Sequence, residues 1–321
     1  MDKLLSPLLR IALLSVAVLA SARAVPALLQ ARGAQLPAGV TGELQVHTLS
    51  SGGLERTYRV YCPAELAGGE VAPVIVCFHG GGGAAQSAIG NYGIVEEAEA
   101  RGWIAVFPEG TGVLSGTGLF GLQTWNAGNC CGYAQQNDVD DVGFFEDLLM
   151  DLGQRYPVDL DQVCATGMSN GAMMTYRLAC ERPALLAAVA PVAGSLESGP
   201  PTAPIPLLTI FGLLDQNVPF EGGVGSGLSG NSFNDQVSSL APFLDINQAR
   251  GIQLVFEDPT ALAWLAPGAE GGANTAYYLA LDGGHTWPGS GGSPINPSDP
   301  VHQTLPATPL MFDFFEVELG L

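Results

Sequence analysis

A serine between two glycines is the strongest indication of chemistry in the sequence. Ser169 is the centre of a Gly-x-Ser-x-Gly pentapeptide, residues 167–171, which follows the apolar run 163–166 and precedes the amphipathic stretch 172–179. On a sharp strand-to-helix turn the serine points outward, and the flanking glycines leave room for a strained backbone. The N-terminus of the following helix would stabilise a developing oxyanion. Ser169 is therefore the predicted nucleophile.

A serine hydroxyl is a poor nucleophile until a base takes its proton, and His285 is the best-placed base. It lies in a glycine-rich loop just after the apolar run 276–281. An imidazole needs a carboxylate that fixes its tautomer, and Asp215 follows the apolar run 207–211. The order Ser169, Asp215, His285 therefore predicts a catalytic triad.

The remaining histidines and a nearby acid are weaker candidates. His79 opens a glycine loop before the serine, so we expect it to shape that loop. His47 and His302 lie in polar terminal regions and are expected to be structural or solvated. Asp282 is a chain neighbour of the predicted base, and such a neighbour rarely folds back onto the same imidazole.

A run of glycines, 80–83, directly follows His79 and could hold an oxyanion. Such a loop can turn a backbone N–H toward a substrate carbonyl, and the N–H of Asn170 would supply the second donor. Gly81 and Gly82 are the candidate donors of the loop. A phosphate-binding loop is the alternative, but no Lys follows the glycines as the Walker pattern requires.

Apolar runs of strand length alternate with amphipathic helical stretches. The runs are residues 74–78, 104–107, 163–166, 187–192, 207–211, 252–256 and 276–281. The helical stretches include residues 92–100, 142–152, 172–179 and 309–319. This alternation predicts an α/β fold with a mostly parallel central sheet and helices on both faces. Glycine clusters interrupt the pattern without dividing it, so residues 25–321 are expected to form one catalytic domain.

Composition excludes several classes of protein. The chain has 321 residues, of which 47% are hydrophobic, which is ample for a core and rules out intrinsic disorder. Its 11 Lys and Arg residues stand against 31 Asp and Glu residues, a net charge of −20. Nucleic-acid binding is therefore not expected, because that affinity comes from clustered basic residues. No Cys-x-x-Cys or His-rich cluster is present, so no metal site is expected.

The first 24 residues have the parts of a secretory signal peptide. Lys3 and Arg10 precede an apolar run, 11–20, and the small-x-small sequence 22–24 follows. The run is too short to span a membrane, which needs about 20 apolar residues. We therefore expect a secreted protein, extracellular or periplasmic, with no membrane span in the mature chain; a retained anchor is the alternative.

The six cysteines fall into two groups. Cys77 and Cys164 lie inside strand-like runs and are expected to be buried thiols, and Cys62 ends a similar run. Cys130, Cys131 and Cys180 are more typical of disulfide bonding, and their pairing is open.

Five segments together carry a resemblance to a known family. They are residues 79–83, 125–132, 139–144, 165–171 and 283–289. In this order they make the mature chain resemble the polyhydroxybutyrate depolymerase-like esterases of the α/β-hydrolase superfamily, which also includes feruloyl and acetyl xylan esterases. The resemblance implies the α/β-hydrolase fold, secretion, no cofactor and hydrolysis of carboxylic esters through an acyl-enzyme. It also implies a disulfide from Cys130 or Cys131 to Cys180. Phe211 departs from the family, where His is frequent, and leaves the triad intact.

The substrate class is the least determined feature. Trp125 and Trp287 flank the predicted active-site loops and could hold an apolar acyl chain or an aromatic ring, or serve as packing anchors. The sequence after His285 is too short for a polymer-binding module, so small or oligomeric esters are expected as substrates. We expect a monomer. A serine peptidase and a non-catalytic binding protein on the same fold are the alternatives.

Overall fold

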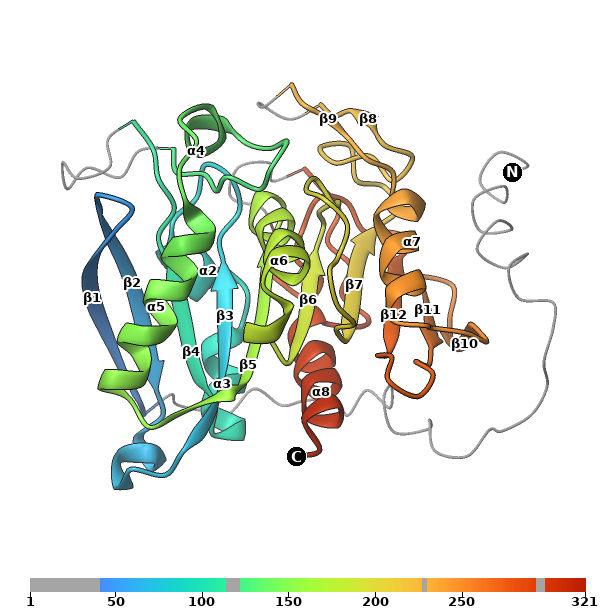
Figure 1. Ribbon diagram of the computed structural model, residues 1–321. Coiled ribbons are helices and arrows are strands. Elements are labelled where there is room, and N and C mark those ends of the chain that lie inside the picture. The colour runs from blue at the N-terminus through green and yellow to red at the C-terminus, as the bar shows by residue number, and fades with distance from the viewer. Residues whose placement is uncertain (1–40, 114–121, 227–229, 293–297) are drawn as a thin grey trace.

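A ten-stranded sheet forms the centre of the computed structural model (Figure 1). The structure describes residues 41–113, 122–226, 230–292 and 298–321, so the predicted signal peptide lies outside the described residues. The strands of this sheet are β1 (Glu43–Ser51), β2 (Leu54–Cys62), β3 (Ala72–Phe78), β4 (Ile104–Pro108), β5 (Val158–Met168), β6 (Ala188–Val192), β7 (Leu207–Gly212), β10 (Gln253–Glu257), β11 (Ala261–Ala266) and β12 (Thr275–Ala280). A separate short hairpin consists of β8 (Gly223–Val224) and β9 (Ser232–Phe233).

The strand order is β1-β2-β4-β3-β5-β6-β7-β12-β11-β10. From β4 to β12 all neighbours pair in parallel, whereas the two strands at each edge pair antiparallel. The carboxyl ends of the central strands are level, because Phe78 pairs with Gly167, Met168 with Val192, and Gly212 with Ala280. The loops that follow these strands therefore meet at one edge of the sheet, where binding sites of such folds lie.

Helices cover both faces of the sheet (Figure 1). They are α2 (Ala85–Asn91), α3 (Ile94–Arg101), α4 (Gly132–Gln136), α5 (Asp141–Arg155), α6 (Asn170–Glu181), α7 (Gln236–Ile246) and α8 (Ala307–Leu319), with short 3₁₀ turns η1 (Ala64–Gly68) and η2 (Pro183–Leu185). The apolar stripes of α5, α6 and α7 belong to one buried cluster, and those of α2, α3 and α8 to the other. The mostly parallel sheet with helices on both faces is thus confirmed.

The structure adds elements that the sequence patterns did not predict. Strand β1 was missed because most of its side chains are exposed, so it lacks an apolar run. Helix α7 was missed because Pro242 lies inside it, although Asp235 caps it by accepting a hydrogen bond from the N–H of Ser238 at 2.8 Å. Helix α2 and strand β11 were also not predicted. Short or interrupted apolar patterns acquire their structure from the sheet on which they pack.

The cysteines differ from the expected pairing. Cys77 and Cys164 are fully buried free thiols, as predicted. The structure pairs Cys130 with its chain neighbour Cys131, and Cys180 is a free buried thiol. The structure therefore does not show the implied bridge to Cys180.

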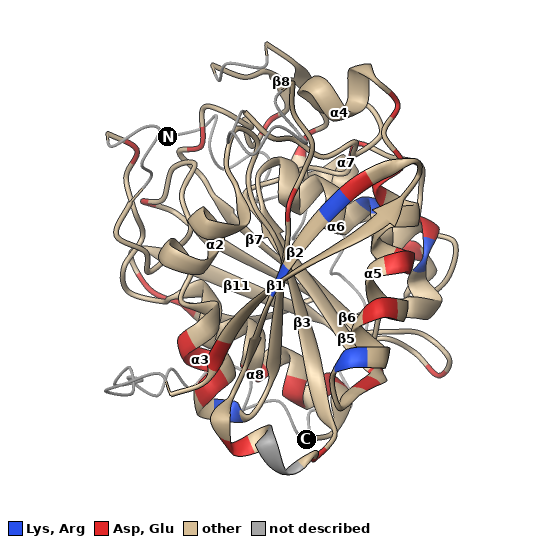
Figure 2. Cartoon of the chain, turned by 90° about the vertical axis from the view of Figure 1, so that its left-hand side faces the viewer, with Lys and Arg blue, Asp and Glu red and all other residues tan. Residues whose placement is uncertain are grey.

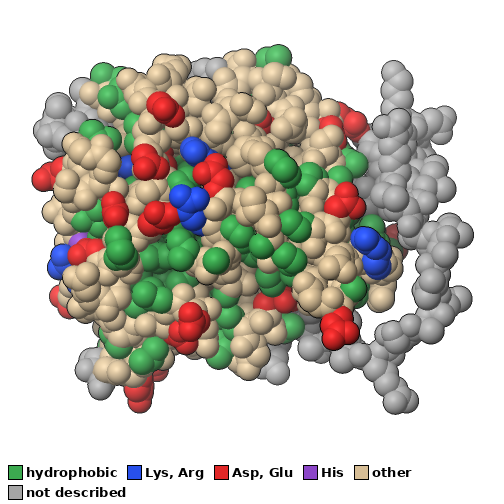
Figure 3. Space-filling model, viewed as in Figure 1, with side chains coloured by type: hydrophobic (Ala, Val, Ile, Leu, Met, Phe, Trp, Pro, Cys, Tyr) green, Lys and Arg blue, Asp and Glu red, His purple; other side chains and the backbone are tan. Residues whose placement is uncertain are grey.

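Acidic residues are spread over the helices and loops (Figure 2). On the face with α5, α6 and α7 their side chains are interspersed with polar and apolar surface (Figure 3). Several arginines in the described chain pair with these acids, for example Arg101 with Glu97, Asp313 and Glu316. No helix within the described ranges is long and apolar enough to cross a membrane. Those residues also include no cluster of His, Cys, Asp and Glu that could hold a metal ion.

Candidate active site

Ser169 stands on a sharp turn between β5 and α6. Its backbone angles are φ +57° and ψ −121°. A positive φ is energetically unfavourable for every residue except glycine, so the turn is strained. Two hydrogen bonds hold this backbone: the Ser169 N–H donates to the Val192 carbonyl at 2.9 Å, and the Ser169 carbonyl accepts from the Met173 N–H at 3.0 Å. The predicted strand–turn–helix context of the serine is thus present.

The flanking glycines let the end of β3 pass directly against this turn. A Cβ on Gly167 would lie 2.7 Å from the Phe78 carbonyl oxygen. A Cβ on Gly171 would overlap the same oxygen and lie 2.6 Å from the His79 carbonyl oxygen. Real Cβ atoms do not approach this closely, so each position requires glycine. The glycine loop that begins at His79 is therefore held beside Ser169.

Gly81 is the loop glycine whose N–H is available for an oxyanion. The Gly82 N–H donates to the Gln123 carbonyl at 2.7 Å, and the Gly83 N–H donates to the Gly80 carbonyl at 3.0 Å. Within the described ranges, the Gly81 N–H has no hydrogen-bond partner, and a Cβ at Gly81 would lie 3.4 Å from the Asn170 Cβ. Of the two candidate donors, Gly81 is therefore the one with a free N–H, because the Gly82 N–H is already bonded to a carbonyl.

The N–H of Asn170 also has no partner among the residues that the structure describes. Asn170 is the first residue of α6, and the first N–H groups of a helix have no acceptor inside it. Gly81 and Asn170 therefore present two free N–H groups from neighbouring segments of backbone. Such a pair is the arrangement by which an oxyanion is stabilised.

His79 shapes the glycine loop, as the sequence predicts. Its ring is fully buried, the Nε2 atom accepts from the Gly110 N–H at 3.0 Å, and the Nδ1–H donates to the Gly80 carbonyl at 2.8 Å. Burial lowers the pKa of His79 to about 4, more than the bond to Gly80 raises it. The ring is therefore neutral at neutral pH, with its hydrogen on Nδ1.

His285 and Asp215 meet across the ends of β12 and β7. The His285 Nδ1 and the Asp215 Oδ2 are 2.7 Å apart. The other carboxylate oxygen of Asp215 accepts from the N–H groups of Asn217 and Val218, both at 2.8 Å. The Asp215 side chain is fully buried, so the carboxylate has one fixed orientation with one oxygen on the backbone and one on the imidazole.

The surroundings of His285 favour the protonated ring overall. Burial lowers the pKa of His285, but the charge of Asp215 and its hydrogen bond raise it, and the charge of Asp299 adds to them. The net effect places the pKa above the usual 6.5. An imidazole of this kind is a stronger base than a solvated one, which suits it to take a proton from a hydroxyl.

Ser169 and His285 lie on loops at the same edge of the sheet, separated by β6 and β7. Within the described ranges the Ser169 hydroxyl makes no hydrogen bond to the His285 ring. A direct bond between them stays a prediction, because catalytic hydrogen bonds are frequently long before substrate binds and tighten in the complex.

A second Asp–His pair nearby has a structural role. The Asp282 Oδ1 lies 2.6 Å from the His302 Nδ1, and the His302 Nε2 accepts from the Leu305 N–H at 3.1 Å. His302 is fully buried, so it supports the loop instead of being solvated. His47 contacts the Tyr156 hydroxyl at 2.6 Å, far from this loop in the sheet.

The two candidate substrate-binding tryptophans are packing residues in this structure. Trp125 is fully buried, and its indole N–H donates to the His79 carbonyl at 2.9 Å. Trp287 is 2% exposed, stacks on Tyr92 with ring centroids 4.2 Å apart, and donates its indole N–H to the Thr308 hydroxyl at 2.9 Å. Side chains so enclosed present no surface to a substrate, so the binding interpretation is corrected in favour of packing anchors.

One contact at the site has no signal in the sequence. The Asn170 carboxamide pairs with the backbone of Trp125: its Oδ1 accepts from the Trp125 N–H at 2.7 Å, and its Nδ2 donates to the Trp125 carbonyl at 3.0 Å. The two residues are 45 positions apart, so no local pattern could join them.

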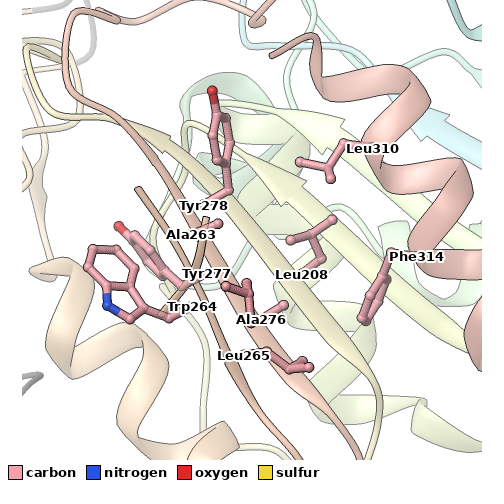
Figure 4. A pocket seen from close by; sticks show the side chains of 10 residues that line it. Leu208, Ala263, Trp264, Leu265, Ala276, Tyr277, Tyr278, Leu310 and Phe314 are labelled. Carbon is pink, nitrogen blue, oxygen red and sulfur yellow. The ribbon is translucent and has the colours of Figure 1, made fainter. Parts of the chain in front are cut away.

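An apolar pocket between the sheet and α8 is separate from this site (Figure 4). Its lining includes Leu208, Ala276, Tyr278, Leu310 and Phe314. Leu208 and Ala276 pair with each other near the beginnings of β7 and β12, whereas Asp215 and His285 follow the ends of these strands. The pocket is therefore a gap in the packing of α8, at the other end of the sheet.

Comparisons with known proteins find similarity to esterases over about half of the chain. No family model matches the chain. It is 35% identical over 175 residues to "Putative esterase NocK" of Nocardia uniformis subsp. tsuyamanensis, covering 53% of this chain and 48% of that protein. It is 29% identical over 175 residues to feruloyl esterase B of Piromyces equi, covering 52% of this chain and 31% of that protein. The chain thus spans about half or less of the length of these relatives.

Solved structures establish the fold. An acetyl xylan esterase from Aspergillus awamori aligns over 75% of this chain and 94% of its own, with a TM-score of 0.53 and 14% identity. An S-formylglutathione hydrolase from Agrobacterium tumefaciens aligns over 78% and 91%, with a TM-score of 0.52 and 13% identity. The predicted α/β-hydrolase fold is confirmed, and the chain is similar in sequence to feruloyl esterases.

Proposed function

We propose that this chain is a secreted serine hydrolase of carboxylic esters, with Ser169, His285 and Asp215 as its triad. The observation that carries the proposal is the buried Asp215–His285 pair, 2.7 Å apart, at the sheet edge that also holds the strained Ser169 turn. The similarity to feruloyl esterases and the α/β-hydrolase fold support ester hydrolysis over other reactions of this fold.

In the first half of the reaction, Ser169 Oγ attacks the ester carbonyl carbon while its proton passes to His285 Nε2. Asp215 accepts a hydrogen bond from Nδ1–H, which leaves Nε2 unprotonated before attack and stabilises the imidazolium afterwards. The N–H groups of Gly81 and Asn170 stabilise the oxyanion of the tetrahedral intermediate. His285 then gives its proton to the alcohol that leaves, and the acyl group remains on Ser169.

Water completes the cycle by the same steps. His285 Nε2 takes a proton from water, which attacks the acyl carbon, and the acid is released as the proton returns to Ser169 Oγ. The fixed carboxylate of Asp215 keeps the imidazole in one orientation through both halves. No cofactor takes part in this scheme.

Hydrolysis of p-nitrophenyl acetate by the wild-type chain and by Ser169→Ala tests this assignment. The variant is expected to lose about 10⁴-fold or more in rate, with the fold intact by circular dichroism. Ser50→Ala is a matched control, because Ser50 is exposed on β1 at the far edge of the sheet, and it is expected to keep the rate within about twofold. Full activity in Ser169→Ala would reject the mechanism.

The substrate class is proposed from similarity. Feruloyl and acetyl esters follow from the relatives, and hydroxybutyrate oligomers from the family resemblance of the motifs. We propose small or oligomeric esters, bound by a monomer. A panel of methyl ferulate, acetylated xylan and hydroxybutyrate oligomers ranks these classes by kcat/KM, and a peptide panel tests the peptidase alternative, for which no turnover is expected.

Export is proposed from residues 1–24. The mature protein is expected in the medium or periplasm, beginning at Val25. N-terminal sequencing of the exported chain checks the cleavage site, and an intact N-terminus on a membrane-retained protein would overturn the proposal.

A further inference from the structure

We propose that Trp125 is a positioning residue that keeps the two halves of the oxyanion hole, the Gly81 N–H and the Asn170 N–H, correctly oriented relative to each other. This inference rests on the proposed function, because it concerns how the N–H groups of Gly81 and Asn170 are aimed. Trp125 touches both segments: its indole bonds to the glycine loop, and its backbone bonds to the side chain that follows the nucleophile.

The first half is the glycine loop, in which two successive peptide groups are fixed. The indole N–H of Trp125 donates to the carbonyl of the His79–Gly80 peptide at 2.9 Å. The carbonyl of the next peptide, Gly80–Gly81, accepts from the His79 Nδ1–H at 2.8 Å and from the Gly83 N–H at 3.0 Å. Because a trans peptide is planar, fixing that carbonyl also fixes the Gly81 N–H on its opposite side.

The second half is the beginning of α6. The Asn170 carboxamide makes two hydrogen bonds with the main chain of Trp125, 2.7 and 3.0 Å long. Asn170 is 2% exposed, so water cannot replace these bonds. They tie the first residue of α6, whose own N–H is free, to the same tryptophan that holds the glycine loop.

Trp125 is itself rigid. Its ring is fully buried and meets the Phe78 ring edge-on, with centroids 5.1 Å apart at 89°. The next residue, Asn126, donates its N–H to the Asp141 Oδ2 at 2.7 Å, and the Asp141 Oδ1 accepts from Arg56 at 2.7 Å in a buried ion pair. Helix α5 and strand β2 therefore anchor the segment that carries Trp125.

The indole N–H has a specific consequence for rate. Trp125→Phe keeps an aromatic ring against Phe78 but leaves the buried His79 carbonyl without its donor, so the His79–Gly80 peptide can rotate. Its rotation displaces Gly80 relative to the His79 ring, whose Nδ1–H holds the Gly80 carbonyl, and so tilts the Gly81 N–H of the same planar peptide. Loss of a whole oxyanion donor costs about 10²–10³-fold in kcat. Misalignment of a donor that is still present should lower kcat less, by about 10-fold. It should weaken stabilisation of the transition state more than substrate binding.

The test compares Trp125→Phe with Trp103→Phe in the full chain. Trp103 is also a buried tryptophan, but it packs against Phe312 and Phe315 on the α8 face. With p-nitrophenyl acetate, we expect Trp125→Phe to lose about 10-fold in kcat with KM within about twofold, and Trp103→Phe to keep kcat within about twofold. An alkyl trifluoromethyl ketone, whose adduct with Ser169 places an oxyanion in the hole, should bind Trp125→Phe about 10-fold more weakly.

The pH midpoint of kcat/KM should stay unchanged in Trp125→Phe, because the variant does not touch His285. Unchanged kcat and ketone affinity in a folded Trp125→Phe, or equal losses in both tryptophan variants, would overturn the proposal. If Trp125→Phe does not fold, Asn170→Ala tests the α6 half of the proposal, because it removes both bonds to Trp125, keeps the backbone N–H and adds no charge beside the oxyanion. An unchanged kcat in a folded Asn170→Ala would then overturn the proposal. An inactive wild type would instead reject the proposed function.

Discussion

Replacing Asp215 by Asn tests the acid of the proposed triad with the smallest change in shape. One oxygen of Asp215 accepts two backbone N–H groups at 2.8 Å, and the other meets the His285 Nδ1 at 2.7 Å. In Asp215→Asn the amide oxygen must accept from the N–H groups of Asn217 and Val218. The opposite orientation would point the amide NH₂, itself a donor, at these two donors. The amide NH₂ then faces Nδ1, which has to accept a hydrogen bond.

This arrangement reverses the tautomer of the imidazole. With Nδ1 as an acceptor, the hydrogen lies on Nε2, and the base cannot take the Ser169 proton. Such a reversal in a serine triad costs about 10⁴-fold in kcat. We expect the same loss here, which is about 5 kcal/mol of transition-state stabilisation at about 1.4 kcal/mol per tenfold.

Asp282→Asn is a matched control within the same chain. Asp282 forms the same kind of bond, 2.6 Å long, to the Nδ1 of His302, and it lies three positions before His285 in the sequence. The kcat of the Asp282→Asn variant for p-nitrophenyl acetate at pH 8 should stay within about twofold of the wild-type value. The reasoning fails if folded Asp215→Asn keeps more than about a tenth of the wild-type kcat, or if Asp282→Asn loses as much activity.

Two further predictions concern pH. The pKa of His285 is raised and its neutral form is the base, so kcat/KM should rise with pH through a midpoint above 6.5. Asp299→Asn removes a charge that raises this pKa, so it should move the midpoint to lower pH. A wild-type midpoint at or below 6.5 would contradict the assignment. Burial lowers the pKa of His79 to about 4. The unfolded chain therefore binds this proton first as the pH falls below 6.5, and urea denaturation should show a loss of about 3 kcal/mol between pH 7 and pH 4. In His79→Gln this contribution to the loss of unfolding free energy should be absent. If the variant loses as much stability between pH 7 and pH 4 as the wild type, His79 is not its cause.

The sequence alone suggests the residues of the proposed triad, because each follows a recognisable apolar strand. Parallel strands buried on both faces consist of near-continuous apolar runs, and the loops after them collect at one edge of the sheet. Ser169, Asp215 and His285 each occupy such a loop, so residue type and place in the pattern were sufficient to select them. The role of His79 in shaping its loop followed from the same pattern.

The roles of the tryptophans could not be predicted in this way. A tryptophan in an active-site loop has the same sequence signature whether it faces a substrate or the core. Trp125 and Trp287 are enclosed because Phe78, His79 and Tyr92 approach them from segments far away in the chain. The pairing of Cys130 with Cys131 was likewise one of several pairings that the spacing allowed.

By itself, the sequence determined the alternation of strands and helices and the three side chains that could perform the chemistry. These depend on local apolar patterns and on residue type, which act between neighbours in the chain. The tertiary structure alone decided that the N–H of Gly81, and not that of Gly82, is free, and that Asn170 is held by Trp125. Each of these depends on which backbone group from a distant part of the chain lies within hydrogen-bond distance, and only the packing of the folded chain determines that.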